Sequence, residues 1–79
     1  MTLDPPFDRI TVDPEQMNGQ PCIRGMRLTV RRVLLALATY TERGELFREY
    51  PALEEEDLQQ ALAFSAANLD DRVDVIEVA

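Results

Sequence analysis

Histidine, lysine and tryptophan are absent from the 79-residue sequence, and cysteine and serine occur once each, as Cys22 and Ser65. A serine or cysteine nucleophile needs a positioned base, usually histidine, and neither residue has one here. Zinc sites require clustered cysteine and histidine ligands, which are also missing. We therefore expect no enzymatic activity, no metal centre and no bound cofactor.

Long apolar runs are missing too, and no positively charged leader precedes an apolar stretch. We therefore expect a cytoplasmic protein with no membrane contact. A domain this small buries only about 60% of its unfolded surface, and a single cysteine cannot form an internal disulfide. Several β-branched residues, including Val73, Val75, Ile76 and Val78, exceed what such a core can hold. These features predict a homodimer.

The charges are distributed unevenly along the chain. Residues 1–53 contain seven acids and seven arginines, whereas residues 54–79 contain eight acids and only Arg72. No acid lies between Glu15 and Glu42. Guanidinium groups in such a segment suit phosphate or carboxylate recognition. The candidate DNA-binding residues are Arg24, Arg27, Arg31 and Arg32. The alternative is that these arginines pair with acids of the same chain or of a second copy.

The segment MNGQPCIRGMR, residues 17–27, is rich in turn-forming residues. Asn18-Gly19 is a tight-turn dipeptide, Pro21 fixes its own φ, and Gly25 can adopt a positive φ. Alternating apolar residues predict short strands over residues 9–12 and 26–30. We therefore expect an N-terminal β-hairpin after an irregular arm of residues 1–8. Cys22 is expected to be a small buried residue rather than a reactive thiol.

Three helices are predicted after the hairpin. Thr29 can cap the first helix. The second is short and ends before Pro51, because proline cannot continue a helical hydrogen-bond ladder. The third begins with the acids of residues 54–57, which suit the positive end of a helix dipole. Helical spacing assigns to the buried faces Val30, Val33, Leu34, Leu37 and Ala38 in the first helix, and Leu58, Ala61, Leu62, Ser65 and Leu69 in the third.

This order of elements matches the outline of a helix-turn-helix domain over residues 1–68, followed by an acidic tail over residues 69–79. The acidic start of the third helix would repel DNA phosphates, so any DNA contact is expected from the arginines. The tail alternates acids with β-branched residues and is expected to be extended or a strand. Such a tail can pair with a partner's sheet edge or within the protein's own dimer. The candidate partner-binding residues are Asp70, Asp71, Val73, Asp74, Val75, Ile76 and Glu77.

The segments RITVDP, NGQPCIRGMRLTV and EYPALEEEDLQQALAFSA resemble the family known as domain of unknown function 433, over residues 9–67. The resemblance implies a mainly α, three-helix fold related to homeodomains. It also implies an antitoxin-like regulator that binds a PIN-like nuclease toxin and operator DNA. The alternatives are a homodimeric DNA-binding regulator and a protein-interaction module, each without a toxin partner.

Overall fold

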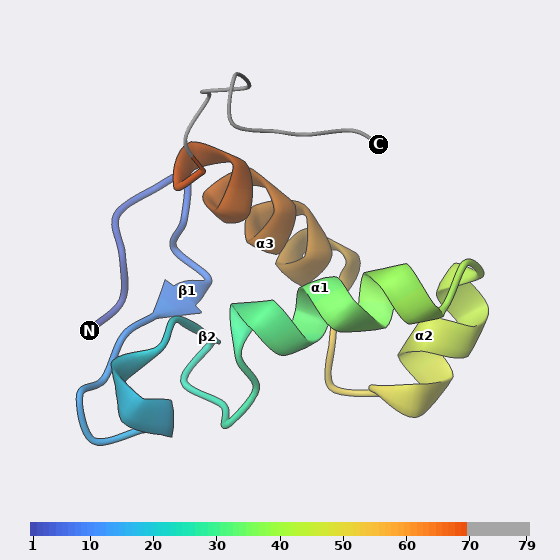
Figure 1. The fold of residues 1–79 in the computed structure, drawn as a ribbon, viewed down its shortest axis with the longest axis horizontal. Coiled ribbons are helices and arrows are strands. Elements are labelled where there is room, and N and C mark those ends of the chain that lie inside the picture. The colour runs from blue at the N-terminus through green and yellow to red at the C-terminus, as the bar shows by residue number, and fades with distance from the viewer. Residues whose placement is uncertain (70–79) are drawn as a thin grey trace, which may run out of the picture.

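Three helices follow a short antiparallel hairpin in the computed structural model, which describes residues 1–69 (Figure 1). The strands are β1 (Ile10–Thr11) and β2 (Cys22–Ile23), with a 3-10 turn, η1, at Met17–Gly19 between them. The helices are α1 (Val30–Thr39), α2 (Arg43–Glu49) and α3 (Glu55–Ala67). The mainly helical fold with an N-terminal hairpin is therefore confirmed. The predicted extended tail falls outside the described residues.

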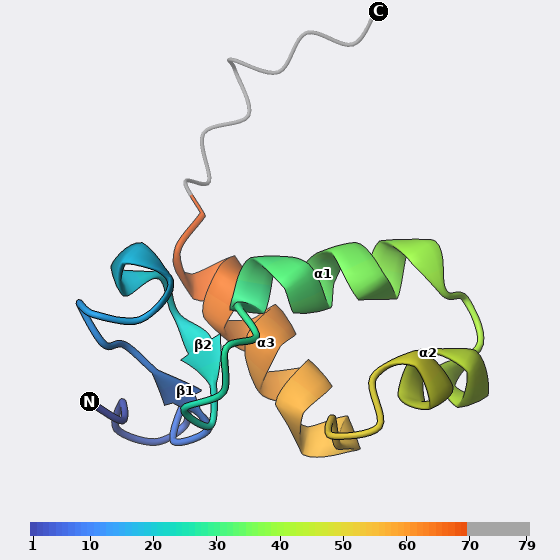
Figure 2. The ribbon, with the colours of Figure 1, turned by 90° about the horizontal axis from the view of Figure 1, so that it is seen from below.

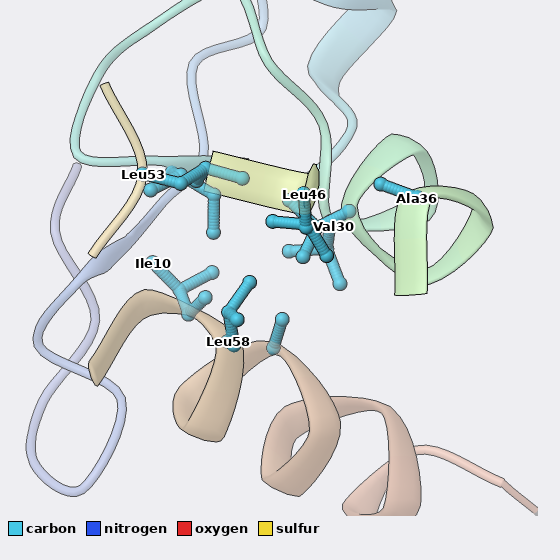
Figure 3. Packing of buried hydrophobic residues seen from close by; sticks show 9 residues of the cluster. Ile10, Val30, Ala36, Leu46, Leu53 and Leu58 are labelled. Atoms are coloured by element: carbon cyan, nitrogen blue, oxygen red, sulfur yellow. The ribbon is translucent and has the colours of Figure 1, made fainter. Parts of the chain in front are cut away.

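The helices α1 and α3 pack against each other and form the centre of the described domain. The hairpin lies beside the N-terminal end of α1, and α2 lies at the opposite end, as both ribbon views show (Figures 1 and 2). Apolar side chains from both strands, all three helices and the α2–α3 loop meet in one core (Figure 3). Its buried members are Ile10, Ile23, Val30, Val33, Ala36, Leu46, Leu53, Leu58 and Ala61.

The second strand lies earlier in the chain than the predicted range of residues 26–30. Ile10 pairs with Ile23, while Thr29 makes only a single bridge, with Cys22. The cause is a tight turn over residues 23–26, in which Arg24 and Gly25 have φ values of 45° and 72°. The Met26 N–H donates to the Ile23 carbonyl at 2.8 Å. Two positive φ values in succession define a type I′ turn, which sends the chain back along β2.

The first residues of the arm are more regular than predicted. Thr2 forms a bridge with Thr11, and the Leu3 N–H donates to the Ile10 carbonyl at 2.9 Å. Phe7 then packs edge-on against Phe64 of α3, with ring centroids 5.5 Å apart. The arm thereby covers one end of the core.

The predicted cap of α1 is confirmed, because the Arg32 N–H donates to the Thr29 hydroxyl at 3.0 Å. Two assignments to the buried face of α3 were wrong: Leu62 is 43% exposed and Leu69 is 73% exposed. In α1, Ala38 is exposed and Ala36 is buried instead.

The polar residue Gln60 explains the change in α3. Its side chain accepts from the Arg9 N–H and donates to Asp8, both at 2.8 Å. These hydrogen bonds make burial of an amide favourable. Gln60 is therefore buried against the arm, whereas Leu62, two positions further along the helix, lies on the outer face.

Candidate functional site

The carboxylate of Asp57, in the first turn of α3, is completely buried and joins two arginines. Arg24 donates to it twice, from Nε to Oδ1 at 3.0 Å and from Nη2 to Oδ2 at 2.8 Å. Arg9 donates from Nη1 to Oδ1 at 3.1 Å. The Glu54 N–H adds a hydrogen bond to Oδ2 at 2.8 Å, which caps the helix. We call Arg9, Arg24 and Asp57 the ion-pair cluster.

Electrostatics in the ion-pair cluster favour the charged forms of all its members. Burial alone would raise the pKa of Asp57, but the hydrogen bonds from Arg24, Glu54 and Arg9 outweigh burial, so its pKa lies below the ordinary value. The pKa values of both arginines are raised, chiefly by their hydrogen bonds to Glu54 and Asp57 for Arg9 and to Asp57 for Arg24. The cluster is a fixed, charged link between the hairpin and α3.

The type I′ turn presents Arg24 to this cluster. Thr11 accepts from the Gly25 N–H at 2.9 Å, and the Gln16 side chain donates to the Gly25 carbonyl at 3.1 Å. From the turn, Arg24 also donates to the Ala52 carbonyl at 2.6 Å. Among the four candidate DNA-binding arginines, Arg24 is thus the one that pairs with an acid within residues 1–69.

The other three candidate arginines come together around one hollow, which we call the arginine pocket. Its volume is about 540 Å³. It lies where the 3-10 turn, the loop before α1, the first turn of α1 and the end of α2 converge. Its lining residues are Met17, Gln20, Arg27, Leu28, Thr29, Arg31, Arg32 and Tyr50.

The three arginines of the pocket are exposed, and within residues 1–69 none of them forms an ion pair. The acids at the start of α3 differ in this respect. Glu54 pairs with Arg9 at 2.6 Å and Glu55 with Arg43 at 3.2 Å. The described domain therefore compensates much of its acidic helix end internally and leaves the pocket's positive charge available.

Tyr50 is the aromatic residue of the pocket, and it is not among the site residues that the sequence predicted. It lies about twenty residues after the arginines and was treated as the end of a helix. Its N–H does donate to the Leu46 carbonyl at 2.8 Å. The half-buried side chain also packs against the core and lines the pocket. The signal in the sequence that could have pointed to Tyr50 as a site residue is the Tyr50-Pro51 pair.

A second hollow, of about 280 Å³, runs between α1 and α3 and is largely apolar. Leu34 and Phe64 line it, and so does Leu69 at the end of the described chain. Arg31 and Gln20 line both hollows, so the two are adjacent. All seven candidate partner-binding residues follow Leu69 and lie outside the described residues.

Three further features of the described part of the chain concern metal binding, the cysteine and membrane spans. Residues 1–69 hold no cluster of three or more His, Cys, Asp and Glu side chains suited to a metal ion. Cys22 is buried, and burial raises the pKa of its thiol, as expected of an unreactive packing residue. No helix in this range could cross a membrane.

Comparison with known proteins gives one family. The model of a protein family of unknown function, DUF433, matches residues 10–65. The fold is similar to the crystal structure of a DUF433 member from Anabaena variabilis, with a TM-score of 0.67 and 30% sequence identity. The similarity covers 76% of this chain and 59% of that chain, so the match spans less than two thirds of the cyanobacterial protein. No curated protein matches the sequence.

Proposed function

The chain belongs to the DUF433 family, and we propose that it is an antitoxin-like regulator that binds a PIN-like nuclease toxin and contacts operator DNA through its arginine pocket. The observation that carries the DNA part is the gathering of Arg27, Arg31 and Arg32 around one hollow without an ion-pair partner in residues 1–69. Neighbouring guanidinium groups repel one another, and a bound polyanion relieves that repulsion.

The charge distribution of α3 supports the same assignment. In a helix-turn-helix domain the recognition helix places its N-terminal residues against the bases. Here α3 contains no arginine or lysine, and its first turn exposes Glu55 and Glu56. Phosphate contacts are therefore assigned to Arg27, which precedes α1, and to Arg31 and Arg32 in its first turn, while α3 mainly packs against the core.

The toxin part of the proposal rests on the family resemblance, and the tail is the segment we assign to it. We propose that residues 70–77, with their alternating acids and β-branched side chains, add a strand to the nuclease. The proposed role is non-catalytic and cytoplasmic. A homodimeric DNA-binding regulator without a toxin is the competing function.

A DNA titration tests the arginine assignment. Fluorescence anisotropy with a labelled duplex from upstream of the gene is measured between 50 and 200 mM salt. The double variant R31A/R32A should bind more weakly. The plot of the logarithm of its binding constant against the logarithm of the salt concentration should be less steep by about two, since each phosphate contact contributes about 0.9.

The matched control removes a positive charge elsewhere. Arg48 is exposed on α2 and forms no ion pair within residues 1–69. R48A should leave both affinity and slope nearly unchanged, and E55Q/E56Q should not weaken binding. Because R48A removes one charge and R31A/R32A removes two, a loss in R48A about half as large as that in the double variant would show that only net charge matters, which contradicts a local contact.

Co-purification tests the toxin. A PIN-like nuclease encoded beside this gene should form a stable complex with the full chain and lose nuclease activity in that complex. A chain truncated after Leu69 should keep its circular dichroism spectrum but fail to bind the nuclease. If no such neighbour exists, or the truncated chain binds it equally well, the toxin assignment of the tail is wrong.

A further inference from the structure

We propose that the arginine pocket holds one unpaired nucleotide of a single-stranded nucleic acid, with the phosphate on the guanidinium groups and the base against Tyr50. The proposal depends on the proposed function in one respect, namely that the same arginines bind nucleic-acid phosphates. It goes further in assigning a base contact and a preferred strand state.

The composition of the pocket is the first argument. A surface that only contacts backbone phosphates needs positive charge and hydrogen-bond donors. This hollow is also lined by the apolar residues Met17 and Leu28 and by the aromatic residue Tyr50. An aromatic ring beside arginines is the combination that single-strand binding proteins use, since bases stack on the ring while the cations follow the backbone.

The position of Tyr50 is the second argument. Its backbone is fixed at the end of α2 by the hydrogen bond to Leu46 and by the following Pro51. Its ring is half-buried against the core. A side chain held in this way loses little conformational entropy on binding. Tyr50, the C-cap of α2, and Arg31, in the first turn of α1, line the same hollow, and the Tyr50 side of that hollow is therefore preorganised.

The absence of a base-reading arginine or lysine from α3 is the third argument. The commonest specific contact to duplex DNA is an arginine or lysine on guanine in the major groove. The helix α3, Glu55–Ala67, has no such residue. A duplex also keeps its base faces stacked and unavailable to Tyr50. An unpaired nucleotide can contact the arginines with its phosphate and Tyr50 with its base at the same time.

Three labelled probes of equal length test the proposal by anisotropy: a single-stranded oligonucleotide, an abasic strand with the same backbone, and a duplex. The wild-type protein should bind the single strand more tightly than the abasic strand. The variant Y50L should weaken single-strand binding by about tenfold, the usual scale for losing one base-stacking contact. Binding of the abasic strand should not change.

Tyr40 provides the matched control, because it also packs against the core but does not line the pocket. Y40L should bind all three probes as the wild type does, and Y50F should keep the preference for bases. Since the chain has no tryptophan and only two tyrosines, Y40F leaves Tyr50 as the sole tyrosine emitter. Its emission should be quenched by the single strand but not by the abasic strand.

Each outcome decides between the two proposals. Equal affinity for the single strand and the abasic strand, or unchanged emission of Tyr50 in Y40F, overturns the nucleotide pocket. Tight duplex binding that depends on Arg31 and Arg32 would then leave the proposed function intact. Absence of binding to all three probes overturns both the nucleotide pocket and the DNA part of the proposed function. Displacement of the single strand by an equal concentration of a nucleoside monophosphate would assign the pocket to a free nucleotide and overturn the proposal. If Y50L fails to fold, the fluorescence of Y40F decides alone.

Discussion

Arg24 donates hydrogen bonds to both oxygens of the buried Asp57 carboxylate, at 3.0 and 2.8 Å, and its own backbone has a φ of 45°. A left-handed conformation is unfavourable for a residue with a Cβ atom. The bidentate ion pair and the hydrogen bond to Ala52 offset that strain. The turn and the helix thus stabilise each other across 33 positions of sequence.

Arg24 and Arg31 should have opposite roles. R24A should lower the free energy of unfolding by about 1 to 2 kcal/mol, because it removes one of the two arginines that pair with the buried Asp57 carboxylate. The loss is moderate because the Arg24 side chain is 35% exposed to solvent. R31A should leave stability within about 0.5 kcal/mol of the wild type. Urea unfolding followed by circular dichroism measures both. A larger loss in R31A than in R24A would contradict the assignment of the ion-pair cluster.

Acid should destabilise the protein partly through Asp57. Its pKa in the folded state lies below the ordinary value of 3.8, so the folded state binds this proton less readily than the unfolded state. The resulting stabilisation is fully present above pH 5 and is lost as the pH falls below about 4. Compared with the wild type, D57N should be less stable at pH 7, and the difference should shrink towards pH 2. A constant difference between pH 7 and pH 2 would show that titration of Asp57 does not contribute.

Two glycines should respond to alanine in opposite directions. Gly25 has a φ of 72° with no atom within 4 Å of an added Cβ, so G25A fits sterically but strains the backbone. A loss of about 1 kcal/mol is expected. Gly44 lies inside α2, also with free space, and G44A should gain about 0.5 kcal/mol through helix propensity. Thermal unfolding of the two variants gives the comparison, and stabilisation by G25A would disprove the I′ turn.

The homodimer remains a prediction. Light scattering during size exclusion at micromolar concentration should give about twice the chain mass of 9.0 kDa. The apolar hollow lined by Leu34, Phe64 and Leu69 is a surface of the described domain that a second copy of the chain could cover. A mass near 9.0 kDa would exclude the dimer.

Loss of the dimer on truncation after Leu69 would assign the tail to self-association and move the toxin surface elsewhere.

Much of the fold follows from the sequence because it depends on neighbouring residues. The Thr29 cap, the end of α2 at Tyr50-Pro51, and the positive φ of Gly25 are each set within a few positions. The acids at the start of α3 follow from the same local rule. The strand range was misplaced because a type I′ turn needed a non-glycine residue, Arg24, with positive φ.

The roles of the arginines were decided only by tertiary structure. Four arginines within nine residues look equivalent in sequence, yet Arg24 faces Asp57 while the other three line a pocket with Tyr50. Helical spacing also favoured Leu62 over Gln60 for the core, because hydrophobicity ignores partners such as Asp8. Which charge meets which acid depends on contacts between distant residues, and these form only when the helices and hairpin pack together.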